Sequence, residues 1–229
     1  MKDFGLTRNL PVKLGATALL FVDVQNYSAE GGGEYAHLPR EEVERRYGYF
    51  FREMRERAVP NMRRLQHACR QARVEVLYTV IESLTQDGRD MGLDYKISRL
   101  FCPRGSRDAQ VIEEIAPVGD EIVIPKTSSS VFISTNIHYV LGNLGVKHLV
   151  VCGVLTDQCV DSTVRDAMFR DYLCVLLQDC MSEPIGSKLS RTNHEASLLT
   201  AEVLLGWVSD SARFLKAVLG QPVASAGDK

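Results

Sequence analysis

The 229-residue sequence lacks the features that mark membrane, secreted and nucleic-acid-binding proteins. No apolar run approaches the roughly 20 residues that a membrane-spanning helix needs, and the first residues contain no apolar core typical of a secretion signal. Neither charge sign is in excess, because 27 Lys and Arg face 29 Asp and Glu, for a formal net charge of -2. We therefore expect a cytoplasmic protein with no nucleic-acid or membrane partner.

The cysteines also lack a pattern. No two form a C-x-x-C pair, so the sequence supports neither a zinc knuckle nor a thioredoxin-type redox motif. Without a secretion signal, free thiols in a reducing compartment are the default for a chain of this length. The six cysteines are Cys69, Cys102, Cys152, Cys159, Cys174 and Cys180.

What is present is the composition of an ordinary globular protein, with 45% hydrophobic and 24% charged residues. Short apolar or β-branched runs without polar alternation predict parallel strands covered on both faces. They lie at residues 17–22, 74–80, 121–124, 148–152 and 173–178, with a weaker sixth near 207–209. Helical apolar spacing lies between them, within residues 60–72, 137–144, 160–168 and 196–204. This alternation predicts an α/β fold with a three-layer, doubly wound, six-stranded and mostly parallel sheet.

We expect one domain over residues 1–220, followed by a flexible tail at 221–229. Two segments depart from the regular alternation. Residues 28–58 read as a helical insertion, with a glycine hinge at 31–33 and then a charged helix that carries an aromatic stripe. Residues 82–107 read as a long irregular loop, and long loops in compact domains are usually functional or disordered.

Three reactive side chains fall at the ends of predicted strands. Asp23 follows the first strand, Lys126 the third and Cys159 the fourth. Each alone has an ordinary structural explanation, as a turn residue, a solvated cation or a small buried hydrophobe. Ligands of open α/β sheets bind beyond the carboxyl ends of the strands, so together the three indicate a reactive site.

The combination suits nucleophilic catalysis by a thiol. A helix N-terminus and a nearby ammonium both stabilise a thiolate, so we expect Lys126 to lower the pKa of Cys159. The carboxylate of Asp23 can accept the thiol proton and pass it to a leaving amine. A redox role for Cys159 with Cys152 or Cys180 is an alternative.

The sequence resembles the isochorismatase-like hydrolases, in their cysteine-hydrolase branch, from about residue 16 to 182. The resemblance rests on the Asp-x-Gln pattern of Asp23 and Gln25, on the Lys-x-x-x-Ser-x-Phe pattern at residues 126–132, and on the block Gly-Val-x-Thr-Asp-x-Cys-Val at residues 153–160. The order of the three motifs on one alternation of strands and helices makes the resemblance specific.

The resemblance implies a catalytic triad. In it Cys159 is the nucleophile, Asp23 the acid and base, and Lys126 the cation that orients the group. It also implies a cis peptide bond between Val154 and Leu155, with the N–H groups of Leu155 and Cys159 forming an oxyanion hole. Family members are commonly oligomeric, so we expect a homo-oligomer, a dimer or tetramer, in which the insertion is a lid or an interface.

Departures from the family pattern narrow the reaction. True isochorismatases of this fold lack the cysteine, so Cys159 favours hydrolysis of a C–N bond. Nicotinamidases carry metal-binding histidines on the loop after the second strand, whereas this sequence has no histidine between His67 and His138. We therefore expect no catalytic metal and no cofactor.

The loop that begins at Glu82 resembles the subgroup acting on ureides and small linear amides, such as ureidoacrylate, biuret and triuret. The predicted function is thus a cysteine-dependent amidohydrolase with a covalent acyl-enzyme. The candidate substrate-binding residues are Gln25, Asn26, Glu82, Phe132 and Gln158. The alternatives are a non-catalytic or regulatory binding protein of the same fold, and a nicotinamidase or carbamoyl-amino-acid amidase.

Overall fold

The computed structural model describes residues 10–29, 32–183 and 192–220. The expected tail at 221–229 and residue 31 of the glycine hinge lie outside these ranges. No described helix is long and apolar enough to cross a membrane.

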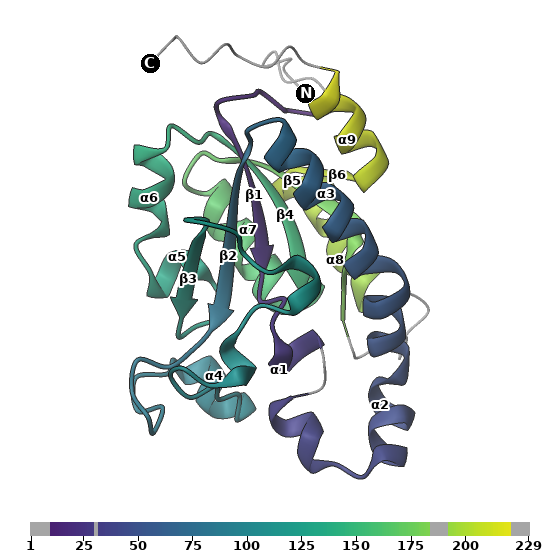
Figure 1. The fold of residues 1–229 in the computed structure, drawn as a ribbon, viewed down its shortest axis with the longest axis vertical. Helices are drawn as coiled ribbons and strands as arrows, with labels where there is room; N and C mark the ends of the chain where they lie inside the picture. The colour runs from purple at the N-terminus through teal and green to yellow at the C-terminus, as the bar shows by residue number, and fades with distance from the viewer. Residues whose placement is uncertain (1–9, 30–31, 184–191, 221–229) are drawn as a thin grey trace.

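One six-stranded sheet forms the centre of the molecule, and every strand pairing in it is parallel. This confirms the predicted fold class (Figure 1). The strands are β1 (Thr17–Val22), β2 (Glu75–Ile81), β3 (Ile122–Lys126), β4 (His148–Val154), β5 (Leu173–Ser182) and β6 (Trp207–Ser209). Their order is β3-β2-β1-β4-β5-β6, so the direction of winding reverses between β1 and β4. A ligand crevice is expected at that reversal.

Both faces of the sheet are covered, which explains the nearly continuous apolar strands. In β1 the side chains of Ala18 and Leu20 join one buried cluster, and those of Leu19 and Phe21 the other. The first cluster is completed by α5 (Val131–Ser134), α6 (Ile137–Asn143), α7 (Asp161–Met168) and α8 (Asn193–Thr200). The second is completed by α3 (Val59–Gln71) and α9 (Ser211–Leu219).

The segment expected as an insertion leads directly into the helix that connects β1 with β2. It begins within α1 (Asn26–Ala29) and contains a 3-10 turn at Gly33–His37 and α2 (Arg40–Glu53). A single π-helical turn, Met54–Ala58, joins α2 to α3, and Figure 1 shows them as one long helix.

The aromatic stripe of α2 packs on its own chain. Phe50 and Met54 are buried in the α3 face of the core. The ring centroid of Tyr35 lies 4.9 Å from that of Tyr47 and 5.3 Å from that of Phe51. These side chains of the stripe therefore pack on their own chain.

The long loop between β2 and β3 crosses the carboxyl ends of the strands. It carries α4 (Leu93–Ser98) and two 3-10 turns, Arg107–Ala109 and Glu113–Ile115. Figure 1 shows α4 and α1 beyond the arrowheads of the strands. An isolated bridge between Gln25 and Val111 attaches the loop to the segment after β1.

Gly153 sets the distance between the two strands at the reversal. It pairs with Val22, the residue before Asp23, and its φ is +125°. A Cβ at this position would lie 2.1 Å from the carbonyl oxygen of Val22. Only glycine therefore lets β4 approach β1 where the reactive residues follow.

We predict that Gly153→Ala lowers the free energy of unfolding by more than about 2 kcal/mol, because it adds backbone strain to a steric overlap. Urea unfolding monitored by circular dichroism measures the change. Gly142→Ala is the matched control, since a Cβ there meets no atom within 4 Å and the position is helical. The control should be neutral or stabilising by about 0.5–1 kcal/mol. Equal stability of the two variants would contradict the proposed role of Gly153.

Candidate active site

The ends of β1, β3 and β4 bring Asp23, Lys126 and Cys159 together. The Nζ atom of Lys126 lies 2.8 Å from Oδ2 of Asp23 and 3.6 Å from Sγ of Cys159. The exposed fractions are 1% for Asp23, 0% for Lys126 and 5% for Cys159. A carboxylate, an ammonium and a thiol therefore share one space from which bulk water is excluded.

The backbone and one hydroxyl fix the carboxylate of Asp23. Its φ is +55°, a left-handed conformation that aspartate adopts more readily than most residues. Its N–H donates to the carbonyl of Thr79 at 3.0 Å, and the Thr79 hydroxyl donates to Oδ1 at 2.7 Å. The β2 strand thus holds Oδ1, and Oδ2 faces Lys126.

Lys126 is the last residue of β3, and its ammonium is held from several directions. It donates to the carbonyl of Ser128 at 3.0 Å, to the hydroxyl oxygen of Tyr95 and to Sγ of Cys159, and it forms an ion pair with Asp23. Burial lowers the pKa of Lys126, but attraction to Asp23 and to the sulfur of Cys159 outweighs it and raises this pKa. The ammonium therefore keeps its proton at neutral pH.

The thiol pKa differs from the sequence-based expectation. Burial raises the pKa of Cys159 to about 12, the opposite of the lowering we expected from Lys126. The ammonium does lower it, but Asp23 acts in the other direction. Since Asp23 lies 2.8 Å from the ammonium, its negative charge offsets much of the cation's effect on the sulfur. At neutral pH the thiol of Cys159 is therefore protonated.

The turn that carries Cys159 is held by the first residues of α8. The peptide bond between Val154 and Leu155 is cis, as the resemblance implied. The π-helical turn Thr156–Val160 follows and leads into α7. Nδ1 of His194 lies 2.9 Å from the Thr156 hydroxyl. Asn193 donates to the carboxylate of Asp157 at 3.2 Å. Two successive residues of α8 therefore fix two successive residues of this turn.

Sequence reasoning missed Tyr95, which the structure places against both reactive groups. Its hydroxyl lies 3.5 Å from Sγ of Cys159, and its ring centroid lies 5.0 Å from Nζ of Lys126. Tyr95 belongs to α4 and is only 2% exposed. Its position in the long loop after β2 was the available signal, because loops at this edge of an α/β sheet line the ligand site.

The structure gives two substrate-binding candidates a structural role. The amide of Gln25 donates to the carbonyls of Ile81 and Asp108 and accepts from the N–H of Ile81. It is fully buried and occupied by these contacts. The carboxylate of Glu82 accepts from the N–H of Gly105 at 2.7 Å, which closes the loop on itself.

The other three candidates do not contact the reactive groups in the hydrogen bonds and ring contacts of the structure. Asn26 donates to the carbonyl of Arg107 at 2.8 Å. The Phe132 ring packs on Tyr172, with centroids 5.7 Å apart. The side chain of Gln158 is exposed. In these contacts none of the three meets Asp23, Lys126 or Cys159, whereas Tyr95 contacts both Lys126 and Cys159.

The redox alternative does not fit the structure. Cys152 and Cys180 belong to the core cluster on the α3 face of the sheet, whereas Cys159 belongs to the cluster on the opposite face. All six cysteines are free thiols. Within residues 10–29, 32–183 and 192–220, no group of three or more His, Cys, Asp or Glu side chains is arranged to hold a metal ion.

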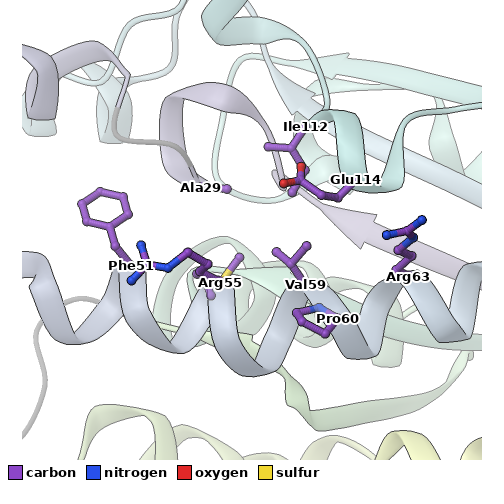
Figure 2. Close-up of a pocket in the computed structure, with 9 residues that line it drawn as sticks. Ala29, Phe51, Arg55, Val59, Pro60, Arg63, Ile112 and Glu114 are labelled. Atoms are coloured by element: carbon purple, nitrogen blue, oxygen red, sulfur yellow. The ribbon is translucent and has the colours of Figure 1, made fainter.

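A cavity of about 590 Å³ lies away from these residues (Figure 2). Its lining includes Met54, Val59 and Ile112, which belong to the α3-face cluster. Because Cys159 packs on the other face, this cavity is separate from the reactive site. The lining residues are Ala29, Phe51, Met54, Arg55, Val59, Pro60, Arg63, Ile112 and Glu114.

Comparison with known proteins places the chain in a family. The isochorismatase domain model matches residues 17–213. A cysteine hydrolase from Pseudomonas syringae pv. phaseolicola 1448A has 25% identity and a TM-score of 0.75, with 92% of this chain and 95% of that chain covered.

Two further solved structures share the fold. An isochorismatase family protein from Desulfovibrio vulgaris subsp. vulgaris str. Hildenborough has 23% identity, a TM-score of 0.70, and coverage of 90% of this chain and 99% of its own. An N-carbamoylsarcosine amidase from Thermoplasma acidophilum has 22% identity, a TM-score of 0.63, and coverage of 86% and 96%.

We predict that iodoacetamide labels Cys159 slowly at neutral pH and faster as the pH rises. A thiol with a pKa raised to about 12 is protonated throughout the range from pH 6 to 9. At pH 8 the folded protein should react at least about tenfold more slowly at this residue than a free cysteine peptide. Peptide mass mapping gives the rate at Cys159, and the urea-unfolded protein is the control. A labelling rate that reaches a plateau below pH 8 would show a stabilised thiolate instead.

Proposed function

The chain belongs to the isochorismatase family, and we propose that within these hydrolases it is a cysteine-dependent amidohydrolase of a small linear amide or ureide. The observation that carries the proposal is the contact of one carboxylate, one ammonium and one thiol in a buried site. Nucleophile, base and cation are the groups that acyl transfer to a thiol requires.

The acylation step follows from the neutral thiol. Sγ of Cys159 attacks the substrate carbonyl carbon, and its proton passes to Oδ2 of Asp23 as the C–S bond forms and the C=O π bond opens. The tetrahedral intermediate collapses when Asp23 returns that proton to the leaving nitrogen and the C–N bond breaks. A base beside the sulfur makes a preformed thiolate unnecessary.

Lys126 stabilises the negative charge that lies first on Asp23 and then develops on the sulfur of Cys159. Its ammonium lies 2.8 Å from Oδ2 of Asp23 and stays charged throughout, because the pKa of Lys126 is raised. When Asp23 takes the thiol proton, the ammonium faces the developing charge on the sulfur at 3.6 Å. The N–H groups of Leu155 and Cys159 complete the proposal as an oxyanion hole for the intermediate.

Deacylation uses the same base. A water molecule gives a proton to Asp23 as its oxygen attacks the thioester carbon, and the C–S bond then breaks. Asp23 returns the proton to the sulfur, which restores the thiol. The products are ammonia or an amine and the carboxylate or carbamate of the acyl part.

The proposed substrate class is supported by the covered position of Cys159 and by one structural neighbour. Cys159 and Tyr95 are 5% and 2% exposed, so the nucleophile lies in a covered site suited to a small molecule. The neighbour from Thermoplasma is an amidase of N-carbamoylsarcosine. It favours a carbamoyl compound, such as ureidoacrylate, biuret, triuret or a carbamoyl amino acid, as the substrate.

We predict that Cys159→Ala lowers kcat by more than about 10⁴-fold, as expected for loss of a covalent nucleophile. Ammonia release is measured over ureidoacrylate, biuret, triuret, carbamoyl amino acids and nicotinamide. Cys69→Ala is the matched control, since Cys69 is buried on the opposite face and lies in a helix. The control should keep kcat within about threefold.

Two outcomes contradict the proposal. Undiminished ammonia release from Cys159→Ala would exclude the covalent route. Absence of release from every compound by the wild-type protein, with Cys159 intact, would favour a binding protein that keeps the pocket. Mass spectrometry of acid-quenched wild-type enzyme should show the acyl adduct on Cys159.

A further inference from the structure

In its contact with Tyr95, the Lys126 ammonium can only be the donor. An ammonium has three N–H donors and no acceptor. Nζ donates to the carbonyl of Ser128 at 3.0 Å, to the hydroxyl oxygen of Tyr95, and to Sγ of Cys159 at 3.6 Å. It also forms an ion pair with Oδ2 of Asp23 at 2.8 Å. The oxygen of Tyr95 is therefore the acceptor of a hydrogen bond from Lys126.

The hydroxyl of Tyr95 is then left with one direction for its own proton. Its oxygen accepts from Lys126, and its other polar neighbour is Sγ of Cys159 at 3.5 Å. Burial, and the nearby charges of Cys159 and Asp23, raise the pKa of Tyr95 well above its usual range, so the phenol stays protonated. We propose that Tyr95 is a further catalytic residue, whose O–H donates a hydrogen bond to the sulfur of Cys159 and stabilises the thiolate.

The donor acts when the thiol loses its proton to Asp23. As that proton leaves, negative charge develops on the sulfur, and Tyr95 supplies a hydrogen bond to it. The same bond stabilises the thiolate again when the C–S bond breaks in deacylation. No proton leaves Tyr95 in either step. The phenol acts as a fixed donor. The hydrogen bond that its oxygen accepts from Lys126 polarises its O–H and strengthens the bond that it donates to the sulfur.

The position of the donor depends on how α4 is anchored. Oδ2 of Asp94 accepts from the N–H of Ser129 at 2.7 Å and from its hydroxyl at 2.7 Å. The N–H of Gly92 donates to the carbonyl of Thr127 at 2.7 Å. These bonds tie α4 to the residues that directly follow Lys126. Tyr95 and Lys126 are therefore held as one unit, and Asp94 is a positioning residue for the phenol.

The inference rests on the proposed function for its catalytic meaning, but its test includes a measurement that needs no substrate. Tyr95→Phe removes only the hydroxyl and keeps the ring over Lys126. Tyr139→Phe is the matched control, because Tyr139 is 70% exposed on α6. Urea unfolding verifies that both variants are folded.

The first measurement is the rate at which iodoacetamide alkylates Cys159 between pH 8 and 9.5. If the Tyr95 hydrogen bond lowers the thiol pKa by about one to two units, its loss raises that pKa and reduces the fraction of Cys159 present as thiolate. The remaining thiolate is more nucleophilic, which offsets part of this reduction. Labelling of Tyr95→Phe should therefore be about three- to tenfold slower than that of the wild-type protein. If Tyr95 only covers the sulfur, removal of the hydroxyl opens space and labelling becomes faster. An unchanged or faster rate in Tyr95→Phe overturns the proposal.

The second measurement is steady-state turnover of the best carbamoyl substrate. Tyr95→Phe should lower kcat by about 10- to 100-fold and leave KM within about threefold, because the hydrogen bond strengthens as charge develops on the sulfur. A rise in KM with unchanged kcat would make Tyr95 a substrate-binding residue instead. If the wild-type protein turns over no amide, the proposed function fails. The labelling rates still show whether Tyr95 donates a hydrogen bond to the sulfur of Cys159.

Discussion

The site depends on one buried ion pair, between Asp23 and Lys126. Each charge makes the burial of the other tolerable, because an unpaired ion in such a place costs several kcal/mol. Burial raises the pKa of the Cys159 thiol, and within the pair the charge of Asp23 offsets part of the lowering that the ammonium exerts. The thiol therefore keeps its proton, and the proposed mechanism needs Asp23 as its base.

Much of the fold could be predicted from the sequence, because it depends on local patterns. All six strands were expected close to their observed positions, and Asp23, Lys126 and Cys159 were placed at strand ends. Parallel strands start at one edge and finish at the other, so residues that follow different strands are brought to a common edge. The predicted insertion was less accurate, since the π-helical turn at Met54–Ala58 continues α2 into α3. No sequence pattern marks that continuity.

The chemistry of individual side chains was harder to predict. The raised pKa of Cys159 depends on burial and on the division of the Lys126 charge between two partners, and neither is visible in a motif. Gln25 lies in the Asp-x-Gln pattern that contributes to the family resemblance, yet its amide holds the strands and loop together. Tyr95 reaches the sulfur from an irregular loop, whose path is set by contacts such as those of Asp94 with Ser129. These contacts exist only in three dimensions.

The same ion pair constrains how such a protein can change over evolutionary time. Replacing either charged partner by a neutral side chain leaves the other charge buried without a counterion. One partner therefore cannot be replaced without the other. Cys159 is neutral at rest and is free of this penalty. A single substitution can therefore replace Cys159 while the ion pair of Asp23 and Lys126 is kept. That difference provides a physical route by which one fold hosts both thiol-dependent and thiol-independent hydrolases.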